Sequence, residues 1–136
     1  MSQQTQRFTF TTDEAGNRLT VIDSTTGLEF TARPVTNDPV THQGAIDACA
    51  SCRVGGHADW ALTTRQELLS LVDLSRYSPA IDTDTFPEFP SDWFWTADLC
   101  AWSSASAWLV GFDDGGVYDF HRDGGGFALA VRRAGQ

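Results

Sequence analysis

Two groups of short alternating segments at opposite ends of the chain constrain its fold most. In each segment apolar and polar side chains alternate with period 2, the pattern of a half-buried strand. Turn sequences rich in Gly, Asn and Asp separate several of them, including 14–17, 24–27 and 113–116. We expect strands over residues 7–12, 19–23, 28–33, 93–96, 107–112, 117–121 and 127–132.

Between these groups the sequence predicts a first helix over residues 41–53. Thr41 is a suitable N-cap, and Gly55-Gly56 ends the helical pattern. Helical spacing places four apolar residues on one face. They are Ala45, Ile46, Cys49 and Cys52.

A second helix is marked more strongly, because Thr64 and Glu67 form the pattern of a capping box. The predicted buried stripe that follows consists of Leu68, Leu69, Leu71 and Val72. The order of strands, two helices and strands predicts an α+β domain with two helices packed on short antiparallel sheets.

The length of 136 residues fits one domain, which we place at 7–136 after a polar, disordered N-terminus at 1–6. A domain of this size buries roughly 65–70% of its unfolded surface, so it needs neither metal nor disulfide to fold.

The charge balance narrows the classes of partner. Formal net charge is −9, from 18 acids, 14 of them Asp, against nine Arg and no Lys. Without a basic patch, direct nucleic-acid binding is not expected. An acidic surface favours basic partners, cations or solubility alone. No apolar run approaches the ~20 residues of a membrane span, and residues 1–10 lack a secretory signal pattern. We therefore expect no membrane partner and a cytoplasmic protein, with display on a virion or cell surface left open.

Seven sequence pieces, in order over about residues 19–133, resemble the DUF1566 family, also described as the C-terminal domain of the Legionella collagen-like protein. Residues 55–73 (GGHADWALTTRQELLSLVD) are similar to its "GG-x-x-DWRLPT-x-x-EL-x-SL" signature. The other similar pieces lie at 23–30, 79–82, 86–87, 93–96, 107–117 and 131–132.

The resemblance implies a C-type-lectin-like fold, similar to formylglycine-generating enzymes and to phage receptor-binding variable proteins. It also implies a ligand-binding module, since some members are adhesins that bind sulfated glycans. This chain departs from the pattern where Ala61 and Leu129 replace two Arg, Thr63 replaces Pro, and Ala130 replaces a frequent Cys. Losing two bidentate donors argues against carrying over the binding of anionic glycans.

The three cysteines allow several interpretations. Cys49-x-x-Cys52, with His57 and either Cys100 or His121, could be written as a zinc or redox site. The resemblance implies a disulfide from the first helix to the last strand, but its expected partner for Cys49 is Ala130. Buried thiols in a reducing compartment are favoured, and a disulfide from Cys100 to Cys49 or Cys52 remains open.

No catalytic pattern stands out. The related formylglycine-generating enzymes bind copper with a late pair of Cys, whereas only Cys100 lies late in this chain. We expect no cofactor, with calcium as a minor alternative because loop acids supply oxygen ligands. Loop Asp is more often a turn former. The loop acids concerned are Asp82, Asp84, Glu88, Asp113 and Asp114.

Aromatic residues divide into two groups. The family pattern places Trp60, Trp95, Trp108 and Phe112 in the core. Trp102 lies in a predicted loop of small residues, where it is either core or part of a recognition surface with Tyr118 and His121.

We therefore expect a non-enzymatic module that binds a protein or glycan through the loops 76–92, 98–106, 113–116 and 122–126. The predicted binding residues are Trp102, Asp82, Asp84, Asp113, Asp114, Tyr118 and His121. The alternative is a cytoplasmic inhibitor, encoded by a phage or mobile element, whose acidic surface binds a basic site on a host protein. An enzyme of the formylglycine-generating type is the third alternative.

Overall fold

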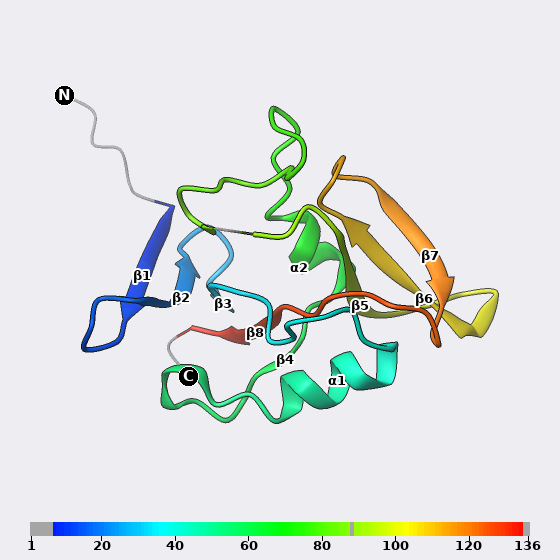
Figure 1. Ribbon diagram of the computed structural model, residues 1–136, viewed down its shortest axis with the longest axis horizontal. Helices are drawn as coiled ribbons and strands as arrows, with labels where there is room; N and C mark the ends of the chain where they lie inside the picture. The colour runs from blue at the N-terminus through cyan, green and yellow to red at the C-terminus, as the bar shows by residue number, and fades with distance from the viewer. Residues whose placement is uncertain (1–6, 88, 135–136) are drawn as a thin grey trace.

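The computed structural model describes residues 7–87 and 89–134 and has the expected α+β architecture (Figure 1). The expectation for residues 1–6 falls outside this part of the chain, as do Glu88 and residues 135–136. Two antiparallel sheets are present, with strand orders β1-β2-β3-β8-β4 and β5-β6-β7. No helix among the described residues is long and apolar enough to cross a membrane.

The larger sheet begins as the predicted N-terminal meander of β1 (Phe8–Thr12), β2 (Arg18–Asp23) and β3 (Leu28–Thr31). The last strand, β8 (Ala130–Arg133), then pairs with β3 and lies inside the sheet. It starts three residues later than expected. The other side of β8 pairs with β4 (Ala61–Leu62), which the sequence did not predict. A two-residue strand is too short to show a period.

The smaller sheet corrects one sequence prediction. Strands β5 (Trp93–Cys100) and β6 (Ser103–Gly111) form a hairpin across the region 98–106 that was expected to be a loop. Runs of Ala and Ser show no alternation of polarity, and the β5–β6 register shifts at two places, which hides the strand pattern. β7 (Val117–His121) pairs with β6 where it was expected.

Helix α1 (His42–Ala50) is capped by the Thr41 side chain, which accepts a hydrogen bond from the Gly44 N–H at 3.1 Å. The helix ends before the predicted limit of 53. Its end is followed by a single 3-10 turn, η1 (Val54–Gly56), in which Gly55 adopts a φ of 67°.

Helix α2 (Arg65–Leu69) has the predicted capping box. The Thr64 side chain accepts from the Glu67 N–H at 3.2 Å, and the Glu67 side chain accepts from the Thr64 N–H at 2.8 Å. The predicted apolar stripe is only partly correct: Leu68 and Leu71 are buried, whereas Leu69 is exposed and Val72 half-buried. The helix is so short that helical spacing no longer governs residues beyond Leu69.

The core consists of two apolar clusters that share strand β5. Phe94 belongs to the first cluster and Trp95 to the second, as expected from alternating strand directions. Trp60, Trp95 and Phe112 are buried, which confirms their core placement. Trp108 is only half-buried, so its predicted core position is wrong.

All three cysteines are buried thiols, and none forms a disulfide. Cys49 lies against the last strand region, where its Sγ is 3.8 Å from the Leu129 carbonyl oxygen. Burial, with a smaller effect of neighbouring Cys52, raises the pKa of Cys49 to about 12. Cys49 is therefore a packing residue and not a reactive thiolate, and the disulfide alternatives involving Cys100 are wrong.

A cluster of charges, buried at Arg132 and Glu29 and exposed at Asp59, joins three segments that are distant in sequence. The Arg132 Nη1 donates to Glu29 Oε1 at 2.5 Å, and its Nε donates to Asp59 Oδ1 at 2.6 Å. Thr20 donates from its hydroxyl to the other Glu29 oxygen at 2.6 Å. The side chains of Arg132 and Glu29 are 3% and 4% exposed, so each charge depends on the other for compensation.

Replacing Arg132 should therefore destabilise the fold strongly. We expect Arg132→Gln to lower the free energy of unfolding by about 3–5 kcal/mol, because Glu29 is left buried without its cation. The neighbouring exposed residue supplies a matched control, Arg133→Gln, which should cost much less. Urea denaturation of the three proteins measures the difference, and equal losses for both variants would contradict this role.

Candidate interaction surface at one end of the domain

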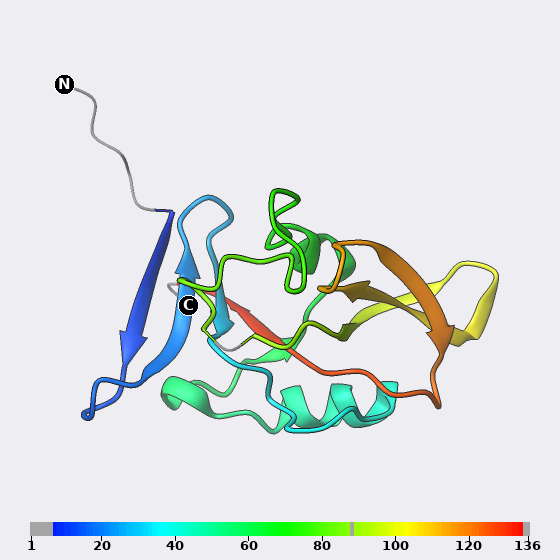
Figure 2. The same cartoon turned by 45° about the horizontal axis from the view of Figure 1, so that its top comes forward.

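The α2–β5 connection and the β6–β7 turn lie side by side at one end of the β5–β6–β7 sheet, along the upper edge of the molecule as drawn (Figures 1 and 2). Ser78 donates from its N–H to the Asp113 carbonyl at 2.8 Å, and Ala80 donates to the Phe112 carbonyl at 2.6 Å. A side chain at Gly115 would place Cβ 2.9 Å from Val72, so the turn approaches the connection closely. The loops 76–92 and 113–116, expected to carry function, therefore do form one surface.

Two large apolar side chains project from this end. Leu74 is 81% exposed and Tyr77 is 83% exposed. The backbone closes behind them, since the Asp73 N–H donates to the Ala80 carbonyl at 2.8 Å. The Asp73 carboxylate also accepts from the Ser75 N–H and hydroxyl. This local turn keeps Leu74 and Tyr77 in contact with water, so little of their apolar surface is buried on folding.

The same loops carry several carboxylates. Arg76 contacts Asp73 and Asp82 at 3.1 and 3.5 Å, while Asp113 and Asp114 are exposed on the adjoining turn. Asp92 is held nearby by its carbonyl, which accepts from the Phe112 N–H. We call this group the loop-end surface. It consists of Asp73, Leu74, Arg76, Tyr77, Asp82, Asp92, Asp113 and Asp114.

A hollow adjoins the surface. Leu74, Asp73 and Asp82 line a cavity of about 490 Å³ together with apolar residues of the core edge, including Ile81. Arg7 also lines this cavity, and both carboxylates already pair with Arg76. The cavity therefore combines charges of both signs with an apolar wall.

Hydrogen bonding keeps key acids of this surface ionised. The Tyr118 hydroxyl and the Gly116 N–H donate to Asp114 and hold the pKa of its carboxyl below the usual range. The Ser75 hydroxyl and N–H lower the pKa of Asp73 in the same way. The same bond to Asp114 raises the pKa of Tyr118, which stays a neutral donor. The surface is therefore negative at neutral pH.

The structure places the predicted binding residues in separate regions. Asp84 is exposed, and its carbonyl accepts a hydrogen bond from Arg18 at 2.8 Å, outside the loop-end surface. Asp82 accepts from the Asp84 N–H and the Thr85 hydroxyl, which is the turn-forming role of a loop Asp. Tyr118 is half-buried and its ring stacks on Trp93 with centroids 5.3 Å apart. Tyr118 therefore holds the Asp114 carboxylate through its hydroxyl and is not itself an exposed contact residue.

Trp102 and His121 lie elsewhere. Trp102 is 66% exposed in the β5–β6 turn, with its ring edge-on to Trp108 at 5.4 Å, so the core alternative for Trp102 is wrong. His121 pairs with Ser106 in the β6–β7 ladder, toward the same end of the sheet as this turn. Tyr118 pairs with Leu109, next to the turn that carries Asp113 and Asp114, so Trp102 and Tyr118 lie toward opposite ends of β6 and do not form the expected common surface.

The positions of the acidic residues and the histidines also decide whether the described residues can hold a metal ion. Across residues 7–87 and 89–134, no group of three or more His, Cys, Asp or Glu side chains is placed to hold a metal ion. Glu88, a sequence candidate for a calcium ligand, is not among these residues. The oxygens of Asp82 and Asp114 serve the turns described above.

The sequence reasoning missed Leu74 and Tyr77. Leu74 continues an apolar run from the second helix, so its pattern indicates core. A signal was nevertheless present, because Asp73-x-Ser75 favours a local turn and Pro79 prevents a helix from continuing.

The bond between Tyr118 and Asp114 can be tested separately. Tyr118→Phe removes the hydroxyl that stabilises the ionised carboxyl, so the pKa of Asp114 should rise. Carbon-detected NMR titration of the Asp carboxyls measures it. Tyr77→Phe is the matched control and should leave the pKa of Asp114 unchanged. An unaltered Asp114 titration in Tyr118→Phe would rule out this hydrogen bond.

Comparison with known proteins agrees with the residue pattern. No curated protein matches the chain. A family model for the Lcl C-terminal domain matches residues 19–132, which include the paired Glu29 and Arg132, Asp59 and all of the loop-end surface. The chain therefore belongs to the Lcl C-terminal domain family.

Proposed function

We propose that this domain is a non-enzymatic binding module whose loop-end surface docks on a basic protein. One observation carries the proposal: Leu74 and Tyr77 are 81% and 83% exposed in a loop that also carries the ion-paired Asp73 and Asp82. Exposed apolar side chains rimmed by polar groups mark interaction sites.

The exposed apolar residues and the acidic residues would contribute differently to binding. Burying Leu74 and Tyr77 against a partner would each contribute about 1.5–3 kcal/mol, so they would supply much of the affinity. Tyr is also enriched among residues that dominate interface energies. The carboxylates of Asp113 and Asp114 would attract a basic partner and speed its association, an effect that salt reduces.

The scaffold is proposed to be C-type-lectin-like. Support comes from the strand–helix–helix–strand order, from the two antiparallel sheets, and from the packing of Cys49 in α1 against the Leu129 region before β8. Such a scaffold keeps its core rigid while the loops carry recognition. Membership of the Lcl C-terminal domain family fits this division of labour.

A cytoplasmic inhibitor from a phage or mobile element would use the same surface. It would cover a basic site on a host protein, with Tyr77 as an anchor and Asp113 and Asp114 opposite the partner's cations. Three unpaired buried thiols suit a reducing compartment. This version differs from the general proposal in the identity of the partner and not in the residues that bind it.

A glycan ligand is the second candidate, and the exposed Trp102 is the observation that favours it. Its ring offers an apolar face at the opposite end of the β5–β6–β7 sheet, supported by Trp108. The two candidates therefore predict loss of binding from substitutions at different ends of one sheet.

Paired variants separate these functions. We expect Leu74→Ser with Tyr77→Ser to weaken capture of the basic partner from source-cell lysate at least about 100-fold, since two anchors are lost. Binding of the parent chain should fall as salt rises. Affinity is then measured with the purified partner at low and high ionic strength.

The matched control is Leu99→Ser with Trp102→Ser, which removes exposed apolar area at the other end. This control should bind the partner like the parent chain. Loss of binding in the control alone, or retention of a glycan on an array that depends on Trp102, would contradict the proposal.

A further inference from the structure

The outermost strand of the larger sheet, β1, has one open edge. It pairs with β2 on one side, and within residues 7–87 and 89–134 no strand pairs with its other side (Figures 1 and 2). The edge of a strand presents main-chain N–H and carbonyl groups that can pair with another strand. The directions of these groups in β1 therefore decide what its edge can bind.

The hydrogen bonds to β2 fix which residues of β1 face outward. At one end of the strand, Ser24 donates its N–H to the Arg7 carbonyl at 2.8 Å. At the other end, Asp13 donates to the Asn17 carbonyl at 2.9 Å, and the register shift before it skips only Leu19 of β2. Since bonding alternates along an antiparallel pair, every second residue of β1 bonds toward β2. The N–H and carbonyl groups that point away from β2 are those of Phe8, Phe10 and Thr12.

The other edge strands in the described part of the chain are protected in ways that β1 is not. β4 has only two residues, and β7 carries Asp119 and His121. The outer edge of β5 is covered, because Trp95 donates to the Phe127 carbonyl and Phe127 donates to the Trp93 carbonyl, both at 2.9 Å. Short length, charge and covering all prevent pairing between sheet edges. β1 has five residues, FTFTT, with neither a charge nor a Pro among them.

The sequence of β1 is complementary to itself. When two copies meet antiparallel with Phe10 on the two-fold axis, Phe10 lies opposite Phe10 and Phe8 lies opposite Thr12 of the second copy. The outward-facing residues then meet one another, and each pair exchanges two main-chain hydrogen bonds. At both ends Arg7 comes opposite Asp13, so the charges that meet have opposite sign. Arg7 is already paired with Asp23, so this meeting favours the register and adds little affinity.

We infer that two copies of this chain associate through their β1 edges in this register, which joins their larger sheets into one continuous sheet. Phe10 is 38% exposed in the single chain and packs beside Phe10 of the second copy, with the Arg18 guanidinium over its ring at 3.6 Å. Contact along one short strand is small, so the dissociation constant is roughly 10 μM to 1 mM. The β1 edge is not part of the loop-end surface, and this association does not depend on the proposed protein partner.

Salt separates this association from docking on a basic protein. Each copy has a formal net charge of −9, so two copies repel one another at long range, while the five residues of β1 carry no charge. Salt screens that repulsion. Dimerisation should therefore strengthen as salt rises, whereas binding to the proposed basic partner should weaken.

Sedimentation equilibrium of the full chain measures the dimer, with two variants that add the same charge to β1. Phe10→Lys should weaken dimerisation at least about tenfold, because the two introduced ammonium groups meet on the two-fold axis and the Phe10 pair is lost. Thr9→Lys is the matched control. Thr9 is exposed and would lie opposite Thr11 of the second copy, so this variant should dimerise within about threefold of the parent chain.

Amide hydrogen exchange tests the register on the parent chain and needs no variant. The N–H of Phe10 faces outward, so its exchange should slow as protein concentration rises. The N–H of Thr11 faces β2 and should exchange slowly at every concentration, which makes it the internal control.

Several results would overturn the inference. They are a parent chain that stays monomeric up to about 1 mM, equal dimerisation of Phe10→Lys and Thr9→Lys, and exchange at Phe10 that is independent of concentration. Protection of the Phe10 N–H only in complex with a different protein would assign the edge to a strand of that protein and would also overturn it.

Discussion

The buried contact of Arg132 with Glu29 and Asp59 is the interaction on which the arrangement of the domain depends. It joins β8 to β3 and to the segment before β4, and so fixes the C-terminal strand inside the larger sheet. Glu29 and Arg132 are register partners of β3 and β8, and breaking the contact would leave the buried Glu29 without its cation. With β8 in place, Leu129 and Ala130 enter the core, where the related pattern has an Arg and a frequent Cys.

Local sequence signals predicted those elements that are stabilised by interactions between residues close together in the chain. The capping box of Thr64 and Glu67, the N-cap Thr41 and the Asp-Gly turn at 113–116 each act within a few residues. The β5–β6 hairpin across 98–106 was missed because cross-strand pairing, and not side-chain alternation, holds its Ala and Ser residues. β4 likewise exists only because β8 lies beside it.

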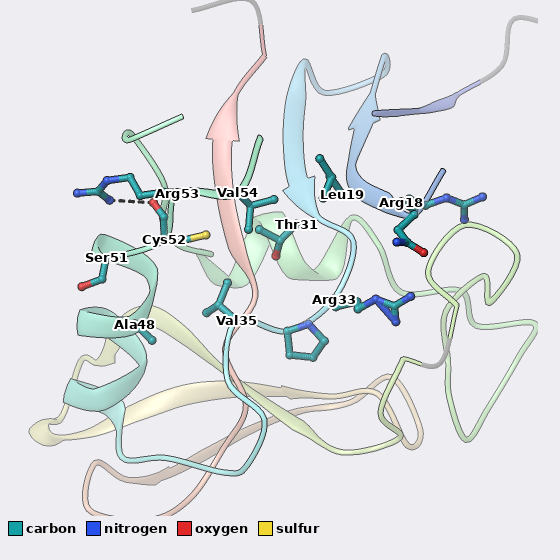
Figure 3. A pocket seen from close by; sticks show the side chains of 12 residues that line it. Arg18, Leu19, Thr31, Arg33, Val35, Ala48, Ser51, Cys52, Arg53 and Val54 are labelled. Carbon is teal, nitrogen blue, oxygen red and sulfur yellow. Dashed lines mark hydrogen bonds between the residues drawn. The ribbon is translucent and has the colours of Figure 1, made fainter. Parts of the chain in front are cut away.

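The candidate sites follow the same rule: features set by local sequence were predicted, and features that depend on the fold were not. Sequence placed Asp113 and Asp114 in an exposed turn, and the structure brings that turn against the connection after α2. The sequence could not show that Leu74 lies outside the core, because its position depends on the hydrogen bond from the Asp73 N–H to the Ala80 carbonyl. The cavity of about 550 Å³ between β2 and the end of α1 was beyond sequence reasoning, since residues 17–19, 31–35 and 48–54 meet only in the folded chain (Figure 3).

The central claim is that the loop-end surface, and not the β5–β6 turn, contacts the partner. Photo-crosslinking tests it most directly, with a benzophenone amino acid placed at position 77 in one protein and at position 102 in another. The account predicts salt-sensitive adducts to one basic protein from position 77 and none from position 102. Adducts from position 102 alone would contradict it.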